Sequence, residues 1–225
     1  MVSSSLKKRL ISGFILGPIT LLAIIAGGIY FKAFVAIAFG LSFKEWVRMA
    51  LKSKTALRDS IIGVLYLLIG FMAFMTLRLE VPQGMYLTFV LMIGVWGSDI
   101  AAYFAGKKFG GAKLAETISP NKTWAGLFGG MVGSSFVLIL FNVLAEPLGN
   151  IVGYELSAFM SFPKAIIVGI FFTILGQGGD LLMSFYKRRV GVKDTGTLIP
   201  GHGGLLDRID SLLTVSPFFL VVLSL

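Results

Sequence analysis

The stretch KAIIVGIFFTILGQGGDLLMSFYKRR, Lys164 to Arg189, joins a long apolar run to one acid and a basic end. A helix needs about 20 mainly apolar residues to cross the ~30 Å hydrocarbon core of a membrane. Residues 164–183 meet this length, so we predict a transmembrane helix there. Asp180 lies near its end, and three cations follow where the chain leaves the membrane.

Similar apolar runs recur on both sides of this stretch, separated by short polar segments. The composition agrees, because 56% of the residues are apolar and 14% are charged, against roughly 25% charged in soluble domains. The sequence therefore predicts an all-α, polytopic transmembrane helix bundle of about seven spans, forming a single integral membrane domain over residues 1–225. The predicted spans are 11–30, 33–50, 60–78, 85–105, 124–145, 164–183 and 211–225.

The positive charge is distributed unevenly among the loops. If the N-terminus is cytoplasmic, seven spans place every lysine and arginine except Lys32, Arg78 and Lys164 on the cytoplasmic side, as membrane topology favours. The net charge of +9 then belongs to one face and suits contact with anionic membrane lipid. No nucleic-acid-binding module accompanies it, so we expect no nucleic-acid partner.

Two acids fall inside predicted spans. An unpaired carboxylate at this depth costs at least ~2.5 kcal/mol, and intramembrane acids usually mark functional sites. Asp99 and Asp180 are therefore candidate site residues, with pairing to a lysine or arginine of a neighbouring helix as the structural alternative. If the helix continues past 183, Asp180, Ser184 and Lys187 share one face.

A second polar segment, TISPNKTWAG at residues 117–126, comes just before the span at 124–145. Serine, asparagine and threonine are common helix caps, which explains part of this pattern. A lysine beside the free N–H groups of a helix N-terminus also suits a polyphosphate. We therefore predict nucleotide contacts here, from Ser119, Asn121, Lys122 and Thr123.

The segment from Ser184 to Asp210 interleaves acids, cations and glycines. The acids suit Mg²⁺, which takes one or two carboxylates and completes its shell with water and phosphate, and the cations can neutralise phosphoryl oxygens. His202 is as compatible with a structural hydrogen bond as with catalysis. Counting Asp180 just upstream, the acids are Asp180, Asp194, Asp207 and Asp210, and the cations considered are Lys187, Arg188, Lys193 and Arg208. This pattern predicts phosphate chemistry on a membrane-embedded substrate.

The spacing of these residues resembles the signature of the phosphatidate cytidylyltransferase (CDP-diacylglycerol synthase) family. The residues that carry the resemblance are Ser184, Lys187, Arg188, Lys193, Asp194, Gly196, Pro200, His202, Gly203, Gly204, Asp207, Arg208 and Asp210. Residues 96–110 and 119–126 are similar to two further motifs of that family. The resemblance implies transfer of CMP from CTP to phosphatidic acid, giving CDP-diacylglycerol and pyrophosphate. It also implies a bacterial-type inner membrane and a cytoplasmic active site built from about 95–123 and 176–211.

The resemblance also implies roles for individual residues. Asp180 and Asp207 would bind Mg²⁺, alone or with a second cation. The nucleotide candidates are Asp99, Ser119, Asn121, Lys122 and Thr123, and the remaining catalytic candidates are Lys187, Arg188, Lys193, Asp194, His202, Arg208 and Asp210. The expected partners are CTP, phosphatidic acid and membrane lipid, with a homodimer left open.

Two other functions remain to be weighed. A CTP-dependent lipid or polyprenol kinase would release CDP instead of pyrophosphate. A cation-coupled transporter would use Asp99 and Asp180 as ion sites, but it would carry polar residues near the membrane midplane and repeat symmetry. The acids here gather towards one face, and no repeat is evident, so an enzyme is favoured.

Overall fold

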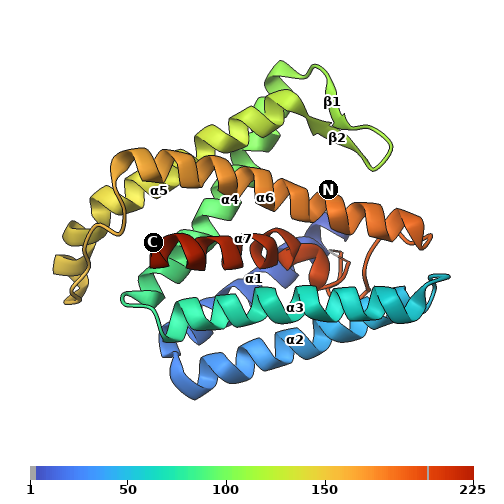
Figure 1. Cartoon of the computed structure of the whole chain (residues 1–225), viewed down its shortest axis with the longest axis horizontal. Helices are drawn as coiled ribbons and strands as arrows, with labels where there is room; N and C mark the ends of the chain where they lie inside the picture. Colours follow the sequence, from blue (N-terminus) through green and yellow to red (C-terminus); the bar gives the residue numbers. More distant parts are fainter. Residues whose placement is uncertain (1–3, 202) are drawn as a thin grey trace.

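The computed structural model describes residues 4–201 and 203–225, with side chains from Ser12 onward. Within these residues the chain forms seven helices and one small antiparallel hairpin (Figure 1). The elements are α1 (Ser4–Ala26), α2 (Gly28–Ala50), α3 (Ala56–Leu79), α4 (Gly84–Phe109), β1 (Lys113–Ala115), β2 (Ser119–Thr123), α5 (Trp124–Val152), α6 (Phe162–Arg189) and α7 (Leu206–Ser224).

Four of these helices, α3 to α6, are long and apolar enough to cross a membrane, with 24 to 29 residues each. Helix α1 contributes a shorter apolar stretch over Ser12–Ala26. The prediction of an all-α membrane protein is confirmed, with the hairpin as a minor addition between α4 and α5. The larger number of seven crossings stays a prediction.

The joint between the first two helices lies earlier than the sequence predicted. The predicted spans 11–30 and 33–50 put it near residue 31, but α1 ends at Ala26 and α2 begins at Gly28. Gly27 has a positive φ of 61°, which favours glycine. The Arg78 Nε donates to the Ile24 carbonyl at 2.6 Å, and a Cβ on Gly27 would lie 2.7 Å from the Arg78 Nη2. A backbone feature, not a polar residue, therefore sets this joint.

Helices α4, α5 and α6 pack closely through small and hydroxyl side chains. A Cβ on Gly129 of α5 would lie 2.3 Å from the Ala105 Cβ of α4, so the two backbones approach as small-residue interfaces in membranes allow. The Thr173 Oγ1 of α6 lies 2.8 Å from the hydroxyls of both Ser98 and Ser134. These contacts fix the relative positions of the three helices.

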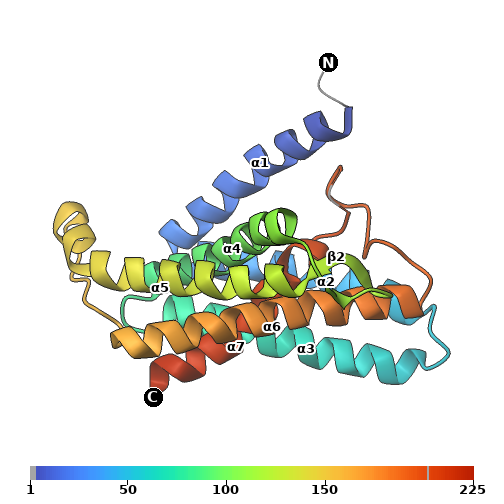
Figure 2. The same cartoon turned by 90° about the horizontal axis from the view of Figure 1, so that it is seen from above.

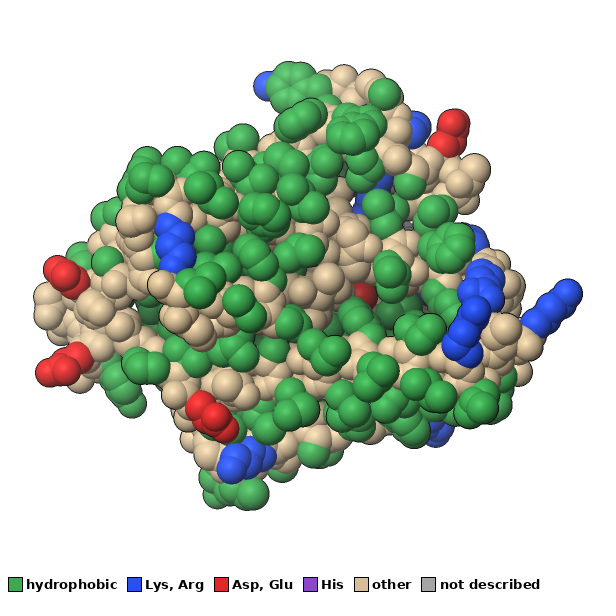
Figure 3. Space-filling model, in the orientation of Figure 1, with side chains coloured by type: hydrophobic (Ala, Val, Ile, Leu, Met, Phe, Trp, Pro, Cys, Tyr) green, Lys and Arg blue, Asp and Glu red, His purple; other side chains and the backbone are tan. Residues whose placement is uncertain are grey.

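The connections between helices fall at two opposite ends of the molecule. The α2–α3, α4–α5 and α6–α7 connections lie at one end, and those joining α1–α2, α3–α4 and α5–α6 lie at the other (Figures 1 and 2). Lysine and arginine side chains gather at the first end, and hydrophobic side chains cover much of the middle (Figure 3). Residues 110–123 and 190–205, far apart in sequence, therefore reach the same end.

Candidate active site

Helix α6 carries the central face of the candidate site. It continues to Arg189, and the Ser184 Oγ donates to the Asp180 Oδ1 at 3.3 Å. The predicted shared face of Asp180 and Ser184 is confirmed, and Lys187 follows on the same helix. The Asp180 side chain is 40% exposed, whereas that of Lys187 is only 11% exposed.

The first ion pair of the site joins β2 to α6. The Lys122 Nζ lies 2.8 Å from the Asp180 Oδ2 and also donates to the Gln177 carbonyl at 3.3 Å. Asp99, from α4, interacts electrostatically with both Lys122 and Asp180. Three residues predicted from separate motifs are thus brought together.

In the segment 117–126, the structure shows which residue caps α5 and which residue reaches the site. The Thr123 Oγ1 accepts a hydrogen bond from the Gly126 N–H at 3.1 Å, and Thr123 is buried. Thr123 therefore caps α5, while Lys122 reaches to α6. On β2, Ser119 is half-buried and Asn121 is exposed.

A second ion pair joins α6 to the start of α7. The Lys187 Nζ lies 2.6 Å from the Asp207 Oδ1, and the Asp207 side chain is only 4% exposed. The Asp207 Oδ2 accepts from the Thr195 N–H at 2.9 Å, the Thr195 Oγ1 at 3.0 Å and the Gly204 N–H at 3.0 Å. Burial alone would raise the pKa of Asp207, but hydrogen bonds from Lys187, Thr195 and Gly204 outweigh it and lower that pKa. Asp207 is thereby held as a carboxylate.

Asp210 interacts electrostatically with members of both ion pairs. It is buried in α7, and its Oδ1 accepts the Ser211 N–H at 2.8 Å. Burial, followed by the negative charge of Asp180, raises the pKa of Asp210 to about 7, and Lys187 and Asp207 also act on it electrostatically. Asp180, Lys187, Asp207 and Asp210 therefore belong to one electrostatic site.

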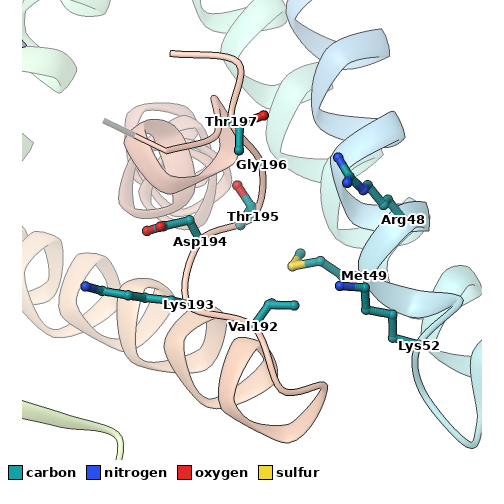
Figure 4. Close-up of a pocket in the computed structure, with 9 residues that line it drawn as sticks. All are labelled: Arg48, Met49, Lys52, Val192, Lys193, Asp194, Thr195, Gly196 and Thr197. Carbon is teal, nitrogen blue, oxygen red and sulfur yellow. The ribbon is translucent and has the colours of Figure 1, made fainter. Parts of the chain in front are cut away.

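The other predicted residues described in the segment 184–210 are exposed. The Arg188 Nη1 donates to the Val192 carbonyl at 3.3 Å, so Arg188 covers the turn that ends α6. Lys193 and Asp194 are exposed and point away from α2 (Figure 4), and Arg208 is exposed on α7. His202 lies outside the described residues.

A cavity of about 220 Å³ separates the end of α2 from the segment that follows α6. Arg48 and Lys52 extend from α2 towards this segment (Figure 4). From the sequence, both residues were predicted only to belong to the cytoplasmic positive charge, and their place near the site depends on the fold. The full lining is Arg48, Met49, Lys52, Val192, Lys193, Asp194, Thr195, Gly196 and Thr197.

Glu45 of α2 was not among the residues predicted for the site, and it is only 7% exposed. Its Oε2 accepts from the Thr195 Oγ1 at 3.0 Å and the Leu206 N–H at 2.9 Å, and its Oε1 accepts from the Leu205 N–H at 2.9 Å. A glutamate inside the predicted span 33–50 was the same kind of signal as Asp99 and Asp180. That signal could have identified Glu45.

The acids of the site suit a metal that is completed by substrate. In the described part of the chain, no group of three or more acids or histidines is arranged to hold a metal by itself. Mg²⁺ needs only one or two carboxylates when phosphates and water complete its shell. Asp180 and Asp207 provide this number, and each is paired with a lysine that can instead bind phosphate. Asp180 is the more accessible of the two, whereas Asp207 would have to exchange some of its present hydrogen bonds for the metal. The donor set therefore fits Mg²⁺ bound together with a polyphosphate.

The fold and the site define an integral membrane protein with acid–lysine pairs gathered at one end of its helices. Comparison with known proteins identifies the family within this broad class. The model of the cytidylyltransferase family matches residues 7–78 and 51–225. The chain belongs to this family, which confirms the resemblance seen in its sequence.

Two relatives illustrate the similarity. A protein of Brucella suis biovar 1 (strain 1330), named phosphatidate cytidylyltransferase, is 32% identical, over 95% of this chain and 91% of that protein. A protein of the same name from Rickettsia bellii (strain RML369-C) is 32% identical, over 97% of this chain and 91% of that protein. The similarity therefore extends over nearly the whole chain and is not limited to the signature residues.

Proposed function

We propose that this protein transfers CMP from CTP to phosphatidic acid in a Mg²⁺-dependent reaction, giving CDP-diacylglycerol and pyrophosphate. The observation that carries the proposal is the convergence of the Lys122–Asp180 and Lys187–Asp207 pairs at one end of α6. The names of the relatives, phosphatidate cytidylyltransferase, support it. Neither a lipid kinase nor a transporter has comparable support.

The reaction matches the chemistry of these residues. A phosphate oxygen of the lipid attacks the α-phosphorus of CTP, and the bond to the pyrophosphate leaving group breaks. The nucleophile is already an anion, so the site must mainly hold two repelling anions together and stabilise the charge that develops. Lys122 and Lys187 provide fixed positive charge. Bound Mg²⁺ would polarise the phosphoryl oxygens.

The proposed roles follow the two halves of the site. Lys122 holds the triphosphate, with Asp99 nearby, and Thr123 keeps Lys122 in place by capping α5. Asp180 and Asp207 hold Mg²⁺, with or without a second cation. The further nucleotide residues are Ser119 and Asn121, the phosphate-binding residues are Lys187, Arg188, Lys193 and Arg208, and the supporting residues are Asp194, His202 and Asp210.

The proposed reaction can be tested with purified protein, labelled CTP and phosphatidic acid. We expect CDP-diacylglycerol and pyrophosphate in equal amounts when Mg²⁺ is present, and neither after chelation. Release of CDP with a phosphorylated lipid would indicate a kinase instead. Absence of any CTP turnover with Mg²⁺ and lipid present would contradict the proposal.

We also propose that one integral membrane domain crosses a bacterial inner membrane seven times, with the N-terminus and the active site in the cytoplasm. The alternation of the connections between two ends supports an odd number of crossings (Figure 1). The gathering of lysines and arginines at the end that carries residues 110–123 and 190–205 supports its cytoplasmic location. Light scattering in detergent would determine whether the protein is a monomer or a homodimer.

Single-cysteine labelling tests this topology, because the chain has no native cysteine. We expect cysteines at positions 54, 113 and 189 to react with a membrane-impermeant reagent only from the cytoplasmic side. A cysteine at position 155, in the α5–α6 connection, is the matched control and should react from the opposite side. Reaction of positions 54 and 189 from different sides would contradict seven crossings.

Lys122→Ala tests the nucleotide role. We expect the KM for CTP to rise by about tenfold or more, the scale of a lost hydrogen bond to a charged group, with a smaller effect on the KM for lipid. Lys113→Ala is the control, because Lys113 is an exposed lysine on the paired strand β1. Unchanged KM for CTP and unchanged kcat in Lys122→Ala would remove Lys122 from the site.

A further inference from the structure

Glu45 links α2 to both ends of the segment that carries the signature residues. We name residues 190–205, between α6 and α7, the signature loop. Thr195 lies early in this loop, and its hydroxyl is within hydrogen-bond distance of the Glu45 carboxylate. Leu205 and Leu206 lie where the loop enters α7, and their N–H groups donate to the same carboxylate. One buried side chain therefore fastens the loop at two points about ten residues apart along the chain.

The carboxylate of Glu45 is held by hydrogen-bond donors and not by a countercharge. Among the described side chains, the ion pairs within 4.0 Å do not include Glu45. A buried carboxylate is costly unless donors surround it, and here two of the three donors are N–H groups at the start of α7. The loop and the N-terminus of α7 must therefore keep their places for Glu45 to remain satisfied.

Two glycines of the signature let the loop close onto this carboxylate. A Cβ on Gly196 would lie 2.7 Å from the Glu45 Oε1, and a Cβ on Gly204 would lie 2.5 Å from the Oε2. At Gly204 the nearest atom to such a Cβ would be the Thr195 Oγ1. A side chain at either position would therefore displace Glu45 or Thr195 from the arrangement that joins the loop to α2.

Thr195 passes this constraint on to Asp207. Its hydroxyl lies 3.0 Å from the Glu45 Oε2 and 3.0 Å from the Asp207 Oδ2. A hydroxyl carries a single proton, so it donates to one carboxylate at a time and stays between the two. The Leu206 N–H, which donates to Glu45, belongs to the residue just before Asp207. The Thr195 N–H also donates to the Asp207 Oδ2 at 2.9 Å. Glu45 therefore acts on the position of Asp207 through Thr195 and through the backbone at the start of α7.

We propose that Glu45 is a positioning residue, which sets the place of Asp207 through Thr195 and the start of α7. Its effect on activity rests on the proposed function, whereas its effect on the loop does not. Glu45 touches neither CTP nor lipid in this proposal. Helix α2 thereby becomes part of the catalytic machinery and not only a membrane anchor.

Glu45→Gln and Thr195→Val test the proposal, with Glu80→Gln and Thr195→Ser as matched controls. Glu80 is an exposed glutamate at the opposite end of the molecule, and serine keeps the hydroxyl that valine removes. We expect kcat to fall at least about tenfold in both test variants, as for residues that orient metal ligands. The KM for CTP should change much less. Glu80→Gln should retain wild-type kcat, and Thr195→Ser should retain much more activity than Thr195→Val.

Hydrogen–deuterium exchange gives a readout that does not depend on activity. In Glu45→Gln, the amides of Leu205 and Leu206 should exchange faster, while exchange in α4 and α5 stays unchanged. Wild-type exchange together with wild-type kcat in Glu45→Gln would overturn the proposal. So would a loss of activity in Thr195→Ser equal to that in Thr195→Val. If the wild-type protein does not turn over CTP, the proposed function fails, and faster exchange at Leu205 and Leu206 still supports the structural link.

Discussion

Asp180→Asn should lower kcat by at least about two orders of magnitude, the scale lost when a group that stabilises developing charge is removed. Asparagine keeps the volume of the side chain but removes the charge that would hold Mg²⁺ against the substrate phosphates. The stability should fall less than in a variant of a fully buried pair, because Asp180 is 40% exposed and Lys122 keeps its hydrogen bond to the Gln177 carbonyl. Steady-state kinetics at saturating CTP and thermal unfolding in detergent measure the two effects.

The control for this variant is Glu116→Gln, an exposed acid in the turn of the hairpin at the same end of the molecule. It should keep both kcat and the unfolding temperature. Near-normal turnover in Asp180→Asn would place this aspartate in the scaffold and move the metal site elsewhere. Early unfolding without loss of turnover would lead to the same conclusion.

Asp207→Asn should lose both activity and stability. Lys187 is only 11% exposed and has Asp207 as its ion-pair partner, so the substitution leaves a buried ammonium group without its countercharge. Removing one partner of a buried pair costs about 3 to 5 kcal/mol. The unfolding temperature in detergent should therefore fall clearly, alongside a kcat at least about two orders of magnitude lower.

A second substitution separates the two losses. Lys187→Met in the Asp207→Asn background removes the unpaired ammonium group, so much of the lost stability should return. Activity should stay low, because neither the carboxylate nor the lysine is restored. If activity returned together with stability, the role of Asp207 would be purely structural.

The sequence does not distinguish Asp180 from Asp207, since the family resemblance implies the same metal-binding role for both. The structure distinguishes them by exposure, because Asp180 faces an accessible surface and Asp207 lies under the signature loop. Exposure depends on which helices pack together, and that was not readable from residue spacing. The predicted shared face of Asp180 and Ser184, by contrast, depends only on helical periodicity, and the structure confirms it.

The same contrast between local sequence properties and long-range packing explains the other differences between the predictions and the structure. The predicted spans overlap the helices because hydrophobic length is a local property, but the α1–α2 joint was misplaced because glycine conformation set it. The position of Glu45 inside a predicted span was readable from the sequence, but its partners were not, because they lie about 150 to 160 residues away. Thr123 was ambiguous between capping and ligand binding until the position of Gly126 was known.

The contact between Arg78 and the end of α1 has a consequence for shortened forms of the protein. The guanidinium group donates to the Ile24 carbonyl and lies 5.9 Å from the centre of the Phe31 ring. A truncation that starts the chain after Gly27 would remove the carbonyl acceptors of α1 and leave Arg78 with the aromatic ring of Phe31. The end of α1 therefore supplies hydrogen-bond acceptors to Arg78 of α3. An N-terminal leader or fusion partner could replace α1 in this role only if it offered equivalent carbonyl oxygens.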